Sequence, residues 1–189
     1  MKYLPNLLTL LRILVIPILI SSFFLEGVLS NWIAAALFIF ASVTDFFDGY
    51  LARLFKAQSN LGRVFDPIAD KLLIATAIIM LVHFGNQDLF ITIPGIIILF
   101  REIFVSGLRE FLAEINVSLP VSHLAKWKTA VQMTALSLMI LGDKGTGIIY
   151  TDEIGRAGLV IAATLTVITG FAYFRATFKH FHKKNEQQS

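Results

Sequence analysis

The sequence predicts an all-α membrane protein: a polytopic bundle of six transmembrane helices with both termini on the cytoplasmic side. Of its 189 residues, 56% are hydrophobic and 15% are charged, whereas about a quarter of the residues in soluble proteins are charged. The mean hydropathy of +0.74 is too high for one soluble core of this length. The sequence has no cysteine, which excludes disulfides and thiolate metal sites.

Six apolar stretches give the helix count, because about 20 apolar residues span a bilayer as a helix. The first, residues 7–25, contains Arg12 and Pro17 and lacks a cleavage pattern, so we expect it to be retained. The second starts near Trp32 and runs past Val43 into a polar end. The others cover about 66–84, 90–106, 127–141 and 158–178. The fifth is short enough to be a buried core helix instead. Without repeats or linkers, one domain spanning residues 1–189 is expected.

Lysine and arginine crowd one set of connections between these stretches. They are Arg53, Lys56, Arg63, Arg109, Lys126, Lys128, Lys179, Lys183 and Lys184. The alternate connections carry mainly acidic residues, with only Lys144 and Arg156 as cations. The positive-inside rule therefore places both termini and the basic connections in the cytoplasm, in a protein of the cytoplasmic (inner) membrane. This orientation explains the net charge of +3 better than a nucleic-acid partner does.

Four aspartates stand where the second apolar stretch ends and the third begins. Asp45 and Asp48 are three residues apart, and Asp66 and Asp70 are four apart, so each pair shares one helix face. If the faces oppose each other, the carboxylates repel one another near lipid unless cations neutralise them. Oxygen ligands without histidine or cysteine suit Mg²⁺ or Mn²⁺. Four carboxylates are enough for two ions.

Small residues and one arginine lie between these aspartates. Gly49, Ala52 and Gly62 leave room for a pyrophosphate to approach the metals, and Arg53 would bind its phosphates as a fork. Two alternatives remain open at this stage. The glycines could serve close helix packing, and Asp66, which precedes Pro67, also fits the N-cap of a helix.

Eight of these positions together resemble the signature of the CDP-alcohol phosphotransferase family. They are Asp45, Asp48, Gly49, Ala52, Arg53, Gly62, Asp66 and Asp70. The resemblance implies a six-helix membrane bundle that forms a homodimer, with the first three aspartates as metal ligands. It implies that Asp70 is the general base and also touches the metal. With CDP-diacylglycerol as the substrate, we expect the glycines, Ala52 and Arg53 to bind it, and Ser59, which lies just before Gly62, to contact the cytosine.

Other motifs resemble the bacterial branch of that family that makes phosphatidylglycerophosphate from CDP-diacylglycerol and sn-glycerol 3-phosphate, releasing CMP. They are residues 5–12, 66–71, 101–102 with 106–110, and 126–129. An acceptor phosphate at the metal site needs cations at that depth, and we expect Arg101, Arg109 and Lys126 to bind it. Lys126 and Lys128 point apart on a helix, and Lys126 is favoured. The alternative is that these cations only set topology or pair with nearby glutamates.

Several hypotheses remain beside this one. The same reaction could use phosphatidylglycerol, serine or an inositol phosphate as acceptor. Aspartates within a membrane protein are also typical of cation transporters. Against this alternative, the four aspartates of this sequence lie at helix ends, and the sequence has no inverted repeat. A purely structural membrane module leaves the four carboxylates unexplained. Asn6, Thr9 and Arg12 form a stripe that is either the polar face of an interfacial helix or a wall of the nucleotide site.

Overall fold

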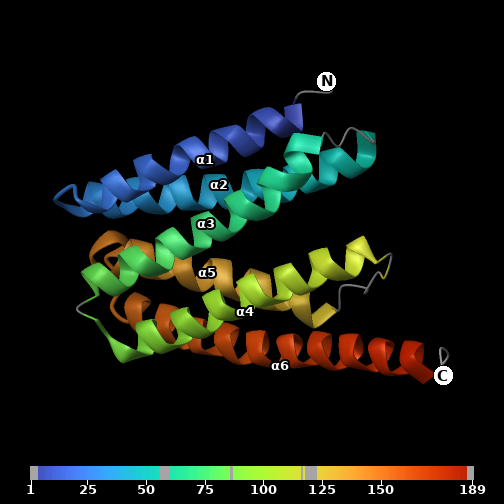
Figure 1. Ribbon diagram of the computed structural model, residues 1–189. Helices are drawn as coiled ribbons and strands as arrows, with labels where there is room; N and C mark the ends of the chain where they lie inside the picture. Colours follow the sequence, from blue (N-terminus) through green and yellow to red (C-terminus); the bar gives the residue numbers. More distant parts are fainter. Residues whose placement is uncertain (1–3, 56–59, 86, 116, 118–122, 187–189) are drawn as a thin grey trace.

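The computed structural model describes the backbone of residues 4–55, 60–85, 87–115, 117 and 123–186. Side chains are described for residues 9–44, 62, 65–85, 87–115, 117, 124–175, 177 and 178. Within these ranges the regular structure is entirely helical, which confirms the predicted class (Figure 1). The helices are α1 (Leu4–Phe23), α2 (Val28–Phe55), α3 (Asn60–Phe84), α4 (Leu89–Glu114), α5 (His123–Thr146) and α6 (Thr151–Glu186).

The helices around the aspartates are longer than the apolar stretches that predicted them. Helix α2 continues through the motif to Phe55, and α3 begins at Asn60 rather than near Asp66. Pro67 therefore lies inside α3, and the interpretation of Asp66 as an N-cap is wrong. Proline removes a backbone donor from a helix, but burial of Ala69 and Leu73 in the bundle favours continuing the helix here. Tertiary packing thus outweighs the local signal.

The connections alternate between the two ends of the bundle (Figure 1). The start of α1, the end of α6, the ends of α2 and α4 and the starts of α3 and α5 lie together, at what we term the site end. The α1–α2, α3–α4 and α5–α6 connections lie at the opposite end, which we term the far end. The helix ends that carry the basic residues Arg53, Arg63, Arg109, Lys126, Lys128, Lys179, Lys183 and Lys184 therefore all belong to the site end.

Three helices are long and apolar enough to cross a membrane by length and composition, among the residues described. These stretches are Phe65–Phe84, Leu89–Glu114 and Thr151–Arg175. The apolar parts of the first two helices, Thr9–Phe23 and Val28–Thr44, are shorter. Helix α5 loses helical geometry at Gly142, with φ 62° and ψ 177°, just past the predicted end of its apolar stretch. Crossing by all six helices stays a prediction.

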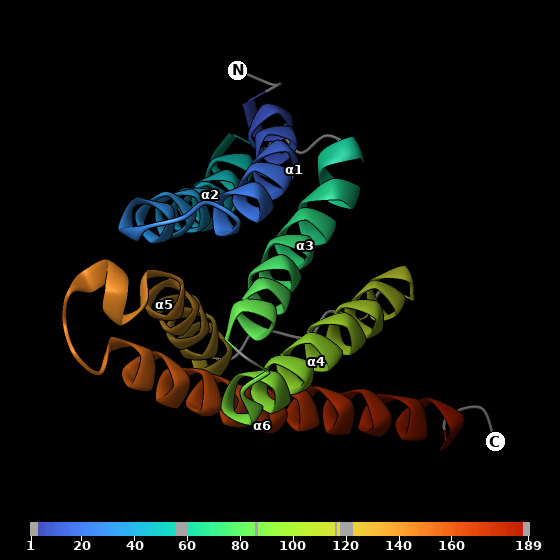
Figure 2. The same cartoon turned by 90° about the vertical axis from the view of Figure 1, so that its left-hand side faces the viewer.

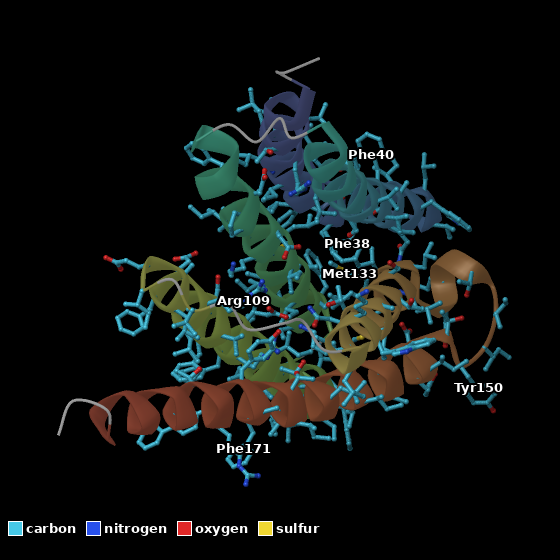
Figure 3. The ribbon with its side chains drawn as sticks, turned by 90° about the vertical axis from the view of Figure 1, so that its right-hand side faces the viewer. Phe38, Phe40, Arg109, Met133, Tyr150 and Phe171 are labelled. Atoms are coloured by element: carbon cyan, nitrogen blue, oxygen red, sulfur yellow. The ribbon has the colours of Figure 1, made fainter. Side chains whose placement is uncertain are left out.

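The core lies between α2, α3 and α5. Helix α1 packs beside α2, and α4 and α6 lie on the other side of α3 (Figure 2). Phe38 of α2 is fully buried and points toward α5, from which Met133 points back (Figure 3). Phe40 and Phe171 instead point out of the bundle (Figure 3), and both are at least half exposed. Large apolar side chains on the outer surface are what lipid-facing helices require.

Candidate active site

The five motif residues on α2 all stand on helical backbone near the end of that helix. They are Asp45, Asp48, Gly49, Ala52 and Arg53. Their side chains, and all of Ser59, lie outside the described residues. Gly62 is buried in the first turn of α3, where a larger side chain would need room inside the bundle. The helical spacing supports a shared face for the two α2 aspartates.

Asp66 and Asp70 stand one turn apart on α3, and both are half-buried. Helices α2 and α3 contact each other, and the end of one lies beside the start of the other at the site end (Figure 1). Among the described side chains, no three acidic or histidine groups come together as a metal cluster. The α2 carboxylates needed to complete such a group fall outside that set, so the four-aspartate site stays a prediction.

Helix α1 reaches this site through Thr9. Its hydroxyl Oγ1 donates a hydrogen bond to Asp66 Oδ1, which joins residues 57 positions apart in the sequence. Thr9 is 2% exposed, and Arg12, three residues later on the same face, is fully buried. The side chain of Asn6 is not among those described. Burial of Thr9 and Arg12 favours the site-wall hypothesis for this stripe over an exposed interfacial face.

A second polar cluster joins α4, α5 and α6. Lys128 of α5 is 3% exposed and forms an ion pair with Glu102 Oε1 of α4. Arg101 Nη1 lies 3.6 Å from Glu102 Oε2, and Arg101 Nη2 donates to Thr169 Oγ1 of α6 at 3.0 Å. The guanidinium carbon lies 6.0 Å from the ring centroid of Tyr173, within reach of a cation–π interaction. In this cluster two cations, Arg101 and Lys128, share one carboxylate, that of Glu102.

The charge of Lys128 interacts mainly with that of Glu102, and more weakly with those of Arg101 and Asp70. Arg109 is exposed and lies on the side of α4 that is turned toward α3 (Figure 3). Lys126 is also exposed, on the opposite side of α5 from Lys128. The structure thus places Lys128 in the interior, where the sequence favoured Lys126. Residue spacing indicated that the two lysines diverge but carried no information on which face of α5 is buried.

Sequence reasoning also missed Gln132, which lies four residues after Lys128 and is fully buried. Both polar atoms of its side-chain amide lack a hydrogen-bond partner among the described residues. Buried amides are normally satisfied, so this group has donor and acceptor capacity left. A signal was available, since a lysine and a glutamine spaced by four on an otherwise apolar helix share one face.

Two hollows lie away from the motif. A cavity of about 810 Å³ opens at the far end, between the α1–α2 connection and the junction of α5 with α6. Its polar residues Asn31, Asp143 and Asp152 already take part in hydrogen bonds that join α2, α5 and α6. The other, of about 630 Å³, lies between the outer faces of α4 and α6 and is almost wholly apolar. Of the two, only the far-end cavity is lined by charged residues, which also include Lys144 and Arg156.

Comparison with known proteins agrees with the motif. The sequence profile of the CDP-alcohol phosphatidyltransferase family matches residues 2–171. The chain is 56% identical over 180 residues to a protein of Rickettsia felis, covering 95% of this chain and 98% of that one. It is 54% identical over 181 residues to a Rickettsia typhi protein, covering 96% and 100%. Both relatives are named CDP-diacylglycerol–glycerol-3-phosphate 3-phosphatidyltransferase. The chain therefore belongs to the CDP-alcohol phosphatidyltransferase family.

Proposed function

We propose that this transferase moves the phosphatidyl group of CDP-diacylglycerol to sn-glycerol 3-phosphate, giving phosphatidylglycerophosphate and CMP. The observation that carries the proposal is near-full-length identity of 52–56% to four relatives named for that reaction. The chemistry of the described side chains is compatible with it, because two half-buried carboxylates stand on α3 and a buried lysine, Lys128, pairs with Glu102 between α5 and α4. The product places the enzyme in phospholipid biosynthesis.

The family generally uses a divalent metal, and the donor set here fits one. We propose that Asp45, Asp48 and Asp66, with Asp70, hold Mg²⁺ or Mn²⁺, as two ions. All four donors are carboxylates at neighbouring helix ends, and the sequence has no cysteine to favour a softer metal. When bound, the metal polarises the pyrophosphate and neutralises charge on the departing CMP.

The residues of this chain supply the remaining steps. Asp70 takes the proton of the acceptor hydroxyl, whose pKa is far too high for it to ionise unaided. The hydroxyl oxygen bonds to the phosphorus that carries diacylglycerol, and the bond from that phosphorus to CMP breaks. Gly49, Ala52 and Gly62 leave space for the pyrophosphate, Arg53 binds it, and Ser59 lies near the cytosine.

The acceptor phosphate is assigned to the cations of α4 and α5. Arg101 and Arg109 stand eight residues apart on one continuous helix, so they lie on similar faces. Lys128 joins them from α5 because it is buried and pairs with Glu102, which also pairs with Arg101, whereas the exposed Lys126 is the alternative. Two arginines and a lysine suit a phosphate dianion, which an uncharged alcohol lacks.

The test is purified protein in detergent with labelled CDP-diacylglycerol, Mg²⁺ and a panel of acceptors. Glycerol 3-phosphate should give a phosphorylated lipid product and an equal amount of CMP. Glycerol, serine, inositol phosphate and phosphatidylglycerol should react much more slowly. A faster reaction with one of these would reassign the acceptor within the family. Absence of CMP release with every acceptor would favour the cation-transporter alternative.

We also propose that all six helices cross the inner membrane, with the site end in the cytoplasm, because the lysines and arginines gather there. Single cysteines introduced at positions 56 and 184 should resist an impermeant thiol reagent on intact cells, and one at position 149 should react. The opposite labelling pattern would invert the orientation. A homodimer, which the family resemblance implies, belongs to the same proposal and is testable by crosslinking in native membranes.

A further inference from the structure

We propose that Thr9 of α1 is a positioning residue that fixes the orientation of the Asp66 carboxylate as a metal ligand. The inference rests on the metal site proposed above and extends it to the first helix of the chain. It assigns a role to the stripe of polar residues on α1, which neither the aspartate motif nor the acceptor cations use.

The contact itself is long-range and partly buried. Thr9 Oγ1 donates to Asp66 Oδ1 from a different helix, and Thr9 is 2% exposed. Two other buried hydroxyls are bonded within their own helix: Ser22 donates to the carbonyl of Leu19 at 2.7 Å, and Thr177 to that of Tyr173 at 2.9 Å. A third, Ser30 of α2, donates to the backbone carbonyl of Ser22 on α1 at 2.7 Å. A buried hydroxyl can therefore donate its hydrogen bond to a backbone carbonyl. Thr9 instead donates to a carboxylate on another helix.

The placement matters because the terminal torsion of an aspartate is broad. A donor on a packed neighbouring helix selects one orientation of the carboxylate. Each carboxylate oxygen has two lone pairs, so Asp66 can accept the Thr9 hydrogen bond and still coordinate a cation. Partners that orient metal ligands in this way change metal affinity by about 10- to 100-fold when they are removed.

The packing of α1 on α3 supports the same role. The two helices contact each other directly, and Arg12, one turn after Thr9 on the same face, is fully buried. Threonine is stiff at its first side-chain torsion, so a well-packed α1 delivers its hydroxyl at a defined point. The carboxylate–hydroxyl pair then links the metal site to a helix that contains none of the four aspartates.

The experiment compares Thr9→Val, which keeps the side-chain shape and removes the donor, with Thr9→Ser, which keeps the donor. Thr177→Val is the matched control, because it deletes a buried hydroxyl bonded within its own helix. Mn²⁺ binding to each purified protein, without substrate, is measured by electron paramagnetic resonance of the free ion. Thr9→Val should raise the Mn²⁺ dissociation constant by about 10- to 100-fold, while Thr9→Ser and Thr177→Val should match the wild type.

Activity gives a second readout. Thr9→Val should need correspondingly more Mg²⁺ for half-maximal rate and recover much of its rate at saturating Mg²⁺, which a damaged fold does not do. Wild-type Mn²⁺ affinity in Thr9→Val overturns the inference. If Thr9→Val elutes as aggregate, Thr9→Ala removes the same donor with less bulk and is judged by the same Mn²⁺ criterion. A wild-type enzyme that binds no Mn²⁺ and works fully in EDTA would instead overturn the proposed metal site.

Discussion

The two ends of the bundle use polar side chains in different ways. At the far end they bond to helix ends: Asn31 Nδ2 of α2 donates to the carbonyls of residues 140 and 141 on α5, at 3.1 and 2.9 Å. Asp143 and Asp152 each accept a backbone N–H from the other's segment, at 3.0 and 3.4 Å. At the site end, two contacts between helices instead join charged or polar side chains directly, Thr9 with Asp66 and Lys128 with Glu102. The far end has such a pair in Arg156 and Asp88.

The difference separates side chains that stabilise the fold from side chains that are able to bind a charged ligand. Backbone carbonyls and N–H groups at helix ends need partners, so the far-end side chains stabilise the fold and leave little capacity for a ligand. Carboxylates and ammonium groups brought together from separate helices keep spare acceptor and donor positions. The site end is therefore where ligand charge can be bound, and substitutions at the two ends should affect different measurements.

The largest effect is expected at the aspartates. Asp70→Asn should lower kcat by about 10²- to 10⁴-fold, the usual contribution of a positioned base, with little change in thermal stability. Asp88→Asn is the matched control, because asparagine keeps the N-cap bond that Asp88 accepts from the backbone N–H of Phe90 at 2.9 Å. The measurement is CMP release at saturating substrates. Wild-type kcat in Asp70→Asn would remove the base from the mechanism.

A smaller effect is expected at the buried lysine. Lys128→Gln should raise the KM for glycerol 3-phosphate by about 10- to 100-fold, the loss of one hydrogen bond to a charged group. The KM for CDP-diacylglycerol should change little. Lys126→Gln is the matched control and should leave both constants near the wild-type values. A larger effect for Lys126 than for Lys128 would restore the preference drawn from the sequence.

Removing Lys128 alone also breaks a buried ion pair, which is costly for stability. The double variant Glu102→Gln/Lys128→Gln removes both charges and keeps the side-chain volumes similar. It should fold better than Lys128→Gln alone and keep the same high KM for glycerol 3-phosphate. Recovery of a normal KM in the double variant would mean that Lys128 matters only as the partner of Glu102.

The smallest effect on activity is expected at the far end. Asn31→Ala should lower the free energy of unfolding by about 1–3 kcal/mol, because two buried carbonyls lose a donor, and kcat should stay at the wild-type level. Arg156→Met should lower the free energy of unfolding by less than about 1 kcal/mol. Arg156 Nε lies 3.0 Å from Asp88 Oδ2 in a geometry that makes no hydrogen bond, and the arginine side chain is 39% exposed. Thermal unfolding in detergent measures both. A large loss of kcat in Asn31→Ala would show that the two ends are coupled.

Much of the fold was predictable from composition and periodicity. Six helices, their alternation and the grouping of basic residues at one end follow from apolar stretches and charge positions, which are local properties. The start of α3 was not predictable, because the proline at position 67 is a strong local signal that packing of the helix in the bundle overrides. Helix ends are set by tertiary contacts that a single sequence does not display.

The candidate site divides in the same way. The resemblance and the spacing assigned the aspartates to two helix faces, and those positions do fall on helices at one end. The hydrogen bond from Thr9 to Asp66 and the burial of Lys128 rather than Lys126 depend on how α1 packs on α3 and how α5 is rotated. Rotation of an apolar helix with few polar residues is weakly specified by its pattern, since apolar residues face lipid as well as the core.

Helix α6 is 36 residues long, which is about 54 Å at 1.5 Å per residue, whereas the hydrocarbon core of a bilayer is about 30 Å thick. Among the residues described, its stretch long and apolar enough to cross a membrane is Thr151–Arg175, and the helix continues to Glu186 at the site end (Figure 1). In the proposed orientation, the site therefore lies at the boundary between the membrane, which holds one substrate, and the surrounding water, which holds the other. CDP-diacylglycerol arrives by diffusion in two dimensions, and its rate of arrival follows its mole fraction in the membrane or micelle. Glycerol 3-phosphate arrives from the surrounding water, so adding detergent dilutes only one of the two substrates.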